Sequence, residues 1–400
     1  MAGALALWTA RPLYVRILIG LGLGLALGLV LGPAAKVLEW PARMVLRGLG
    51  ALAPALILVA ILQAILAAEI QPRVALRLGG LLVLNTVTAI AVGLTVANTL
   101  KPGAGAHLVN AGPPPAVKGD LVAQLVDNVP DSLLRPFVDN NVIGVVLIAL
   151  AFGVAARRLA TPERARVTEL VSLGMSWILV VLHWLIALVP LAVLGKVASI
   201  VGTGGLHAFA ALGWFVIAVL VALLLQASYY LLRIRFGSWV RPRDLLRGTR
   251  DALVMAFSTA SSTATMPVTY ERLRFRVGLR EQSASLGALV GSNFNNDGTA
   301  LYEAMATLFV AQLLGVHLTL PQQLMVVLTS VIASVGAAGI PEAGLVTMTL
   351  VFSAVKLPTE YIPLLLTVDW FLDRCRTMIN VMGDMNVACL LDGKERAPLT

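Results

Sequence analysis

Long stretches without a charged side chain run through the whole sequence. In the first 232 residues these stretches span 17–35, 48–68, 78–100, 140–156, 170–195 and 197–232. A helix that crosses the hydrocarbon core of a membrane needs about 20 mostly apolar residues. Charged residues make up only 13% of the chain, whereas soluble domains carry about 25%. The sequence therefore predicts an all-α polytopic membrane protein with simple spans in its first part, and it argues against an ordinary soluble enzyme.

The charged residues are distributed unevenly between the connections. Basic residues crowd two of them, at Arg233, Arg235, Arg241, Arg243, Arg247 and Arg250, and at Arg272, Arg274, Arg276 and Arg280. The connection 101–139 instead carries four aspartates against three basic residues. Because basic loops stay on the cytoplasmic side, we expect both termini and the 233–250 connection to be cytoplasmic, in an inner (plasma) membrane, with the first apolar run retained as a helix. The net charge of +9 then indicates contact with lipid headgroups, and no nucleic acid partner is expected.

Before residue 250 the apolar stretches are ordinary Leu, Val and Ala runs, and after it polar residues enter them. Ser261, Ser262 and Pro267 interrupt one stretch, and Gly336 to Pro341 interrupt another. An intramembrane aspartate follows each break at a similar distance. Paired, broken hydrophobic segments are typical of re-entrant half-helices at the binding site of a transporter. Two proline-kinked spanning helices are the alternative.

Six polar residues share one side of the last apolar stretch: Asp369, Asp373, Arg376, Thr377, Asn380 and Asp384. On a helix they fall within an arc of roughly 100°. A charged group at the bilayer centre costs at least ~2.5 to 3.5 kcal/mol, so these groups need partners. Substrate and ions are one set of partners, and an internal salt-bridge network is the alternative.

The run from Ser292 to Thr299 favours leaving the helix, because it is rich in Asn, Asp and Gly. Asp297, Asp384 and the carbonyls of Asn295 and Asn380 could then supply the oxygens that a hard alkali cation prefers. No cluster of His or Cys suggests a transition metal.

Four motifs together resemble the dicarboxylate/amino acid:cation symporters, the glutamate and aspartate transporters. They are the Ser-rich break at 261–267, the 295–299 run, the 336–344 loop and the run from Asp373 to Asp384. The resemblance implies a homotrimer of protomers with eight transmembrane helices, two re-entrant helical hairpins, inverted repeats and an elevator-type movement. Residues 1–250 would form six transmembrane helices that include the trimerisation scaffold and part of the transport domain. Residues 251–392 would form the core transport domain, and 393–400 a cytoplasmic tail.

The resemblance also implies a pocket for an acidic amino acid. Asp373 would hold the amino group, Arg376 the side-chain carboxylate, and Asn380 with the backbone near Ser261 and Ser262 the α-carboxylate. Thr299, Thr377 and the loop from Ile340 to Gly344 would complete the pocket. Helix N-termini and a bidentate arginine fork suit two carboxylates, which agrees with this assignment.

Sodium is the coupling ion that the resemblance implies. Its ligands would be Gly291, Asn293, Asn295, Asp297, Asn380, Asp384, Ser334, Val335, Ala337, Asn85 and Thr86. Two positions depart from the family pattern: Leu82 replaces a sodium-associated tyrosine and Asn296 a methionine. Coupling to protons in place of sodium therefore remains an alternative.

At two further positions the sequence resembles the eukaryotic branch of the family, the excitatory amino-acid transporters. Arg374 would compensate for an arginine that other members carry where this chain has Ala260. Glu303 would accept a proton in a step linked to potassium countertransport, or else be a helix-end carboxylate paired with an arginine.

We therefore expect a secondary active transporter, not an enzyme and without a prosthetic cofactor, that moves L-aspartate or L-glutamate with Na+ by alternating access. A proton-coupled or weakly Na+-coupled amino acid or dicarboxylate transporter is one alternative. An anion-conducting channel and a non-transporting amino-acid sensor are alternatives from other classes.

Overall fold

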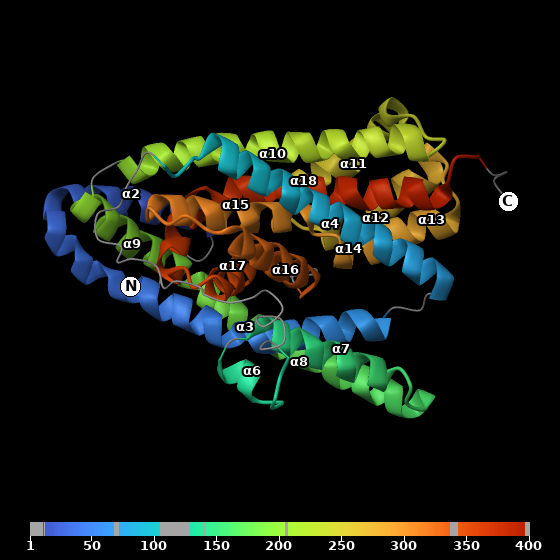
Figure 1. Ribbon diagram of the computed structural model, residues 1–400, viewed down its shortest axis with the longest axis horizontal. Helices are drawn as coiled ribbons and strands as arrows, with labels where there is room; N and C mark the ends of the chain where they lie inside the picture. Colours follow the sequence, from blue (N-terminus) through green and yellow to red (C-terminus); the bar gives the residue numbers. More distant parts are fainter. Residues whose placement is uncertain are drawn as a thin grey trace.

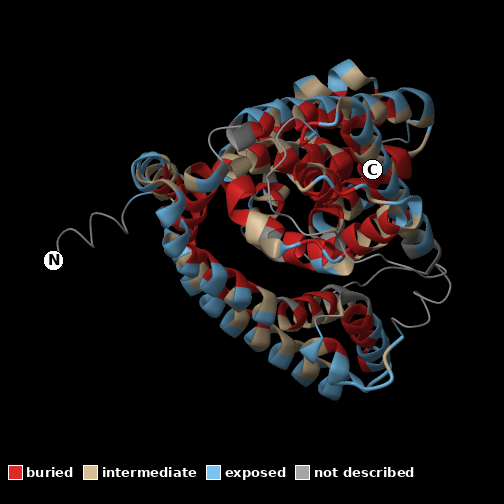
Figure 2. Ribbon diagram, turned by 60° about the vertical axis from the view of Figure 1, so that its left-hand side comes forward, coloured by how far each residue is buried: buried red, intermediate tan, exposed pale blue. Residues whose placement is uncertain are grey.

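The computed structural model describes residues 11, 13–67, 72–104, 129–139, 141–204, 207–336 and 343–396. Within these ranges every regular element is a helix (Figure 1), which confirms the predicted all-α class. Exposed residues follow the outer helices and buried residues fill the centre (Figure 2).

One group of helices comes mainly from the first half of the chain. It comprises α2 (Leu13–Leu31), η1 (Gly32–Glu39), α3 (Trp40–Ala67), α6 (Arg135–Val138), α7 (Val142–Ala156), α8 (Thr161–Ala187) and α9 (Val189–Gly204). Helix α9 packs against α2 and η1, and α3 packs against α7 and α8. Gly24 and Gly28 let α2 approach α9 closely, since a Cβ at either position would lie 2.7 Å from a backbone oxygen of α9.

The second group surrounds α15 and α18. It comprises α4 (Pro72–Leu100), α10 (His207–Gly237), α11 (Pro242–Thr259), α12 (Ser262–Glu271), the π-helix η2 (Arg272–Val277), α13 (Glu281–Ser285), the π-helix η3 (Leu286–Val290), α14 (Gly291–Phe294), α15 (Asp297–Leu313), α16 (Leu320–Gly336), α17 (Ala343–Ala354), η4 (Thr359–Tyr361) and α18 (Ile362–Asp392). Helix α18 packs against α10, α11 and α15. Nearly every residue of α15 is buried, so the polar residues at its start lie deep in the bundle.

Four helical stretches in the described ranges are long and apolar enough to cross a membrane: Val15–Gln63, Leu76–Leu100, Thr161–Thr203 and Ala210–Gly237. Large apolar side chains cover their outer faces; Trp177, Trp184 and Leu224 are each exposed by two thirds or more. In water such surfaces would be unfavourable. A surface that faces lipid requires exposed apolar side chains of this kind.

The predicted spans 170–195 and 197–232 are wrong in their limits. Helix α8 ends at Ala187, and α9 continues through Lys196 to Gly204. The Lys196 ammonium is buried and lies 2.6 Å from a carboxylate oxygen of Glu39, so its charge does not end the helix. The arginine-rich connection is also shorter than expected, because α10 includes Arg233 and ends only at Gly237. The boundary expected after residue 250 falls within α11.

The first interrupted stretch is a helical hairpin whose turn lies at Ala260. This residue has a left-handed backbone (φ 50°), and Ser261 caps α12 by accepting a hydrogen bond from the Ala264 N–H at 3.1 Å. Pro267 lies inside α12, so it does not form the break as expected. The second stretch divides into α16 and α17, which contact each other. The alternative of one kinked helix is therefore wrong for the first stretch.

Candidate functional site

The polar face of α18 is directed into the bundle, and Arg376 lies at its centre. Its side chain is 1% exposed, and its Nη2 atom lies 2.8 Å from Asp373 Oδ1 and 3.0 Å from Asp369 Oδ1. The guanidinium also stacks 4.1 Å over the ring of Tyr302 from α15. Nε and Nη1 have no hydrogen-bond partner in the part of the chain that the structure describes. Two donors of a buried cation therefore remain for a ligand.

Several residues predicted for substrate binding lie around this guanidinium. A Cβ at Gly344 would lie 3.4 Å from Nη2 of Arg376, so the start of α17 passes close to it. The Thr377 hydroxyl donates to the Asp373 carbonyl at 2.8 Å. Asn380, one turn further along α18, reaches Thr299 Oγ1 at 3.5 Å. The structure thus brings α15, α17 and α18 together at one point.

The hairpin formed by α11 and α12 reaches the same region. The Ser262 hydroxyl donates to the Ser292 carbonyl at 3.3 Å, which ties the start of α12 to α14. Arg374 donates through Nη1 to the carbonyls of Phe257 (2.9 Å) and Ser258 (2.5 Å), in the last turn of α11. The guanidinium of Arg374 therefore lies beside the turn at Ala260. This is the position at which other members of the family are expected to carry an arginine, for which Arg374 would compensate.

The helix is interrupted between α14 and α15, as the sequence predicts. Asn295 and Asn296 have non-helical backbones (ψ 82° and 48°). Residues at the interruption bond across to α18. The Gly298 backbone N–H donates to Asn380 Oδ1 at 2.8 Å, and the Asn295 side-chain amide donates to the Asn380 carbonyl at 3.0 Å and to Asp384 Oδ1 at 3.2 Å.

We call Asn295, Asn380 and Asp384 the second oxygen cluster, to distinguish it from the first oxygen cluster around Asp297, which is described next. Gly291 passes so close that a Cβ there would lie 2.7 Å from Asp384 Oδ1. The Asn295 Oδ1 atom is buried without a hydrogen-bond partner among the described residues. Carboxylate, amide and backbone oxygens with an unsatisfied acceptor are a donor set that fits an alkali cation.

Asp297 belongs to a different set of contacts. Its carboxylate accepts hydrogen bonds from Thr86 Oγ1 at 2.7 Å and from the hydroxyl of Tyr230. Asn85, next to Thr86 on α4, accepts at its side-chain oxygen from Arg233. We call Asn85, Thr86 and Asp297 the first oxygen cluster. The two clusters adjoin, because Tyr230 also lies beside Gly383 of α18.

Sequence reasoning missed the contribution of α10 to this site. Gln226, Tyr230 and Arg233 have the spacing i, i+4 and i+7, which places them on one face of a helix. The Gln226 amide donates to the Asn85 carbonyl at 3.4 Å. A polar stripe at this spacing on an otherwise apolar helix is the signal that could have revealed it. Tyr302 and Asp369 were also not assigned to the site.

Glu303 is fully buried in the middle of α15. Thr347 and Arg376 lie near it, but its carboxylate oxygens make no hydrogen bond of good geometry within the described residues. It does not lie at a helix end, and among these residues no arginine lies within 4.0 Å of it. The alternative of a helix-end ion pair therefore does not hold.

The remaining predicted residues are not brought to either cluster by any described contact. The Asn293 side chain donates back to the Leu289 carbonyl of its own turn at 3.0 Å. Ser334 and Val335 lie in the last turn of α16, whose side chains are not described. Ala337 and Ile340 lie outside the described residues.

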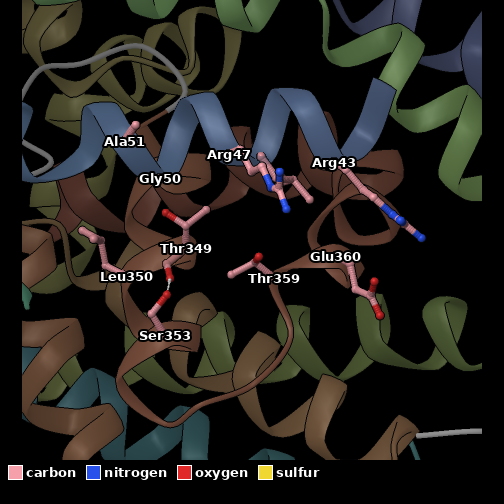
Figure 3. A pocket seen from close by; sticks show the side chains of 10 residues that line it. Arg43, Arg47, Gly50, Ala51, Thr349, Leu350, Ser353, Thr359 and Glu360 are labelled. Atoms are coloured by element: carbon pink, nitrogen blue, oxygen red, sulfur yellow. Dashed lines mark hydrogen bonds between the residues drawn. The ribbon is translucent and has the colours of Figure 1, made fainter. Parts of the chain in front are cut away.

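A pocket of about 410 Å³ lies where α3 faces α17 and η4. Figure 3 shows Arg43 and Arg47 on α3 opposite Thr349 and Ser353 of α17, with Glu360 at the other end. No residue predicted for substrate or ions lines it. It marks the junction between the two groups of helices.

The chain is similar in sequence to several known transporters. The chain is 37% identical to an excitatory amino acid transporter of Caenorhabditis elegans over 263 residues, which cover 65% of this chain and 52% of that protein. It is 38% identical to excitatory amino acid transporter 2 of Homo sapiens over 249 residues, 61% of this chain and 43% of that protein. For excitatory amino acid transporter 4 of Mus musculus the identity is 45% over 182 residues, 45% of this chain and 32% of that protein. The chain thus spans about half or less of the length of these curated relatives.

The model of the sodium:dicarboxylate symporter family matches residues 13–394, which is almost the whole chain. This is a family of transporters and not of enzymes, as the sequence predicts. The chain belongs to the sodium:dicarboxylate symporter family.

Proposed function

We propose that this chain is a secondary active transporter that moves an acidic amino acid, L-aspartate or L-glutamate, together with cations. The observation that carries the proposal is the buried guanidinium of Arg376, whose Nε and Nη1 atoms lack partners among the described residues. A buried donor without an acceptor is unfavourable, so a carboxylate ligand would satisfy it by charge-assisted hydrogen bonds.

The charges near Arg376 support an amino acid, rather than a plain dicarboxylate, as the substrate. The Asp373 carboxylate is partly accessible, at 24% of its side chain, and would pair with the substrate ammonium. The start of α12 near Ser261 and the amide of Asn380 would receive the α-carboxylate, since the N-terminal N–H groups of a helix favour anions. A neutral amino acid would leave the guanidinium donors unsatisfied.

The second oxygen cluster supports a coupling cation, and we favour Na+. The buried carboxylate of Asp384 would attract the ion, and Asn295 would supply an amide oxygen that has no other partner among the described residues. Glu303 would carry a proton in one half of the cycle and allow K+ to return in the other. Its position near Arg376, although not in contact with it, would link that step to substrate release.

The same proposal includes the assembly and the mechanism. Family membership supports a homotrimer in the plasma membrane, with eight spanning helices, two re-entrant hairpins and cytoplasmic termini. The helices around α15 and α18 would then move as the transport domain against the group formed by α2, α3, α7, α8 and α9. The junction at Arg43, Arg47 and Glu360 would lie on the sliding interface.

Proteoliposomes test the proposal. Labelled aspartate should accumulate under an inward Na+ gradient, and Arg376→Cys should abolish that accumulation or shift it to a neutral amino acid. Arg376→Lys is the matched control, because it keeps the charge but changes the donor geometry, and we expect partial activity. If neither a Na+ nor a proton gradient drives accumulation, the transporter proposal fails. A substrate-independent current would indicate a channel, and binding without flux a sensor.

Glu303→Gln separates the coupling steps. If Glu303 links a proton to K+ return, the variant should exchange internal and external aspartate normally but lose net uptake that depends on internal K+. Unchanged K+ dependence would remove Glu303 from the coupling scheme.

A further inference from the structure

The first oxygen cluster differs from the second in that protein donors already use its oxygens. The Asn85 side-chain oxygen accepts from the Arg233 guanidinium, and the two Asp297 oxygens accept from Thr86 and Tyr230. An alkali cation needs several oxygens directed at it at once. Here the amide and carboxylate oxygens are directed at hydrogen-bond donors.

Arg233 is the source of positive charge at this cluster. It is half-buried in α10, and its guanidinium lies 5.4 Å from the ring centroid of Tyr229. Among the described residues no carboxylate lies within 4.0 Å of it, so it is not engaged in a contact ion pair. Its partner Asn85 directly precedes Thr86, which donates to Asp297, so the guanidinium lies at this cluster. A guanidinium stays protonated in proteins, so this charge is permanent.

The hydroxyl that reaches Asp297 comes from α10 as well. Leu82 of α4, where the family resemblance expects a sodium-associated tyrosine, packs instead with Leu78, Val387 and Leu391. Tyr230 supplies a hydroxyl from another helix, and it donates to Asp297. The polar stripe of α10 therefore places a hydrogen-bond donor and a permanent positive charge at the first oxygen cluster.

The second oxygen cluster has neither feature. No arginine or lysine among the described residues donates to Asn295, Asn380 or Asp384, and Asn295 Oδ1 is unsatisfied. A cation bound there would meet one carboxylate and no competing positive side chain.

We propose that the guanidinium of Arg233 is a built-in substitute for a coupling cation at the first oxygen cluster, so that Asn85, Thr86 and Asp297 bind no Na+ while the second oxygen cluster does. The inference rests on the proposed cation coupling, and it lowers the number of Na+ ions that each chain binds. A cation bound by Asn85 would displace the guanidinium and be repelled by it.

The test counts the Na+ ions bound on folding, without requiring transport. The thermal unfolding midpoint of the purified full chain is measured against Na+ concentration, with choline keeping the ionic strength constant and no amino acid present. The steepness of that dependence reports the number of ions bound by the native state. Arg233→Gln should raise this number by about one relative to the wild type, and adding Thr86→Val to it should remove the gain.

Two variants control for charge alone. Arg235→Gln removes an exposed arginine two positions further along α10 and should leave the Na+ dependence unchanged. Arg233→Lys keeps a positive charge at the cluster and should also match the wild type. An Arg233→Gln variant with the wild-type Na+ dependence overturns the proposal.

A second measurement applies if Arg233→Gln does not fold. Thr86→Val in the otherwise wild-type chain removes one oxygen of the first cluster with little change in shape. It should leave the Na+ dependence unchanged, and a loss of about one ion would contradict the proposal. If the ion counts are as expected but aspartate is not taken up, the transport function alone is wrong. If uptake is normal but Arg233→Gln binds no more Na+ than the wild type, only the role of Arg233 is wrong.

Discussion

The guanidinium carbon of Arg376 lies 4.1 Å from the ring centroid of Tyr302, and both side chains are almost fully buried. Arg376 comes from α18 and Tyr302 from α15, so the contact joins the two central helices. The Asp369 and Asp373 carboxylates hold the same guanidinium at Nη2. Ring and carboxylates together fix the orientation of the two remaining donors before any ligand arrives. Such preorganisation lowers the cost of binding.

Replacing Tyr302 by leucine should therefore weaken aspartate binding. A desolvated cation–π contact contributes about 2 kcal/mol, which corresponds to roughly thirtyfold in affinity. Tyr302→Phe keeps the ring and should bind within about threefold of the wild type, because the stacking face is unchanged. Isothermal titration of both variants with aspartate checks this, and equal affinities for the two would show that the ring does not orient Arg376.

Removing Arg374 should destabilise the hairpin formed by α11 and α12. Its guanidinium bonds two carbonyls in the last turn of α11, where a positive charge also interacts favourably with the helix dipole. Arg374→Met should lower the free energy of unfolding by on the order of 1 kcal/mol, because the side chain is partly exposed. We expect Arg374→Lys to retain about half of the effect. Thermal unfolding in detergent measures both, and a similar loss in the lysine and methionine variants would exclude a role for the charge.

The sequence predicts best where the signal is local. The interruption before Asp297 was correctly located, because Asn, Asp and Gly in succession disfavour a helix whatever surrounds them. The serines near residue 261 and Pro267 indicate a hairpin, yet the turn itself is at Ala260. Alanine carries no turn signal, and the turn lies where α11 packs against α12 and where Arg374 bonds the last turn of α11.

The first oxygen cluster could not be predicted in full, because it depends on contacts between distant helices. An arginine after a long apolar run is ordinarily a cytoplasmic marker, and Arg233 was interpreted in that way. Its partner Asn85 lies 148 positions earlier, on α4. Only the packing of α4 against α10 reveals that the guanidinium is turned into the bundle.

The buried ion pair between Lys196 and Glu39 should be important for stability at the junction of α9 with η1. The two groups are 2.6 Å apart, and their side chains are 4% and 8% exposed. Among the described residues, Lys196→Met would leave the carboxylate with the exposed Arg43, at 2.9 Å, as its one cationic partner. Breaking a buried pair costs about 3 to 5 kcal/mol, and we expect the lower end because Arg43 remains.

The double variant Lys196→Met/Glu39→Leu replaces both charges by apolar groups and should recover much of that loss. Lys36→Met, on the exposed side of η1, is the matched control and should have little effect. A chemical-denaturation or thermal series in detergent gives these differences. If the double variant is as unstable as Lys196→Met alone, the lost stability does not come from an unpaired carboxylate.

Asp392, just beyond the last apolar run, should make stability depend on pH. Burial would raise the pKa of its carboxyl group, but the hydrogen bonds from Trp239 (2.7 Å) and Arg280 (3.0 Å) outweigh burial and hold the pKa below its ordinary value. Since the folded-state pKa is lower than that of the unfolded chain, the carboxylate contributes stability above the ordinary aspartate range. That contribution is lost as the pH falls through the folded-state pKa. The unfolding midpoint of Asp392→Asn should thus lie below that of the wild type at neutral pH, and the difference should disappear on acidification. Asp139→Asn, at an exposed position, should show no such change, and a pH-independent difference for Asp392→Asn would contradict the assigned cause.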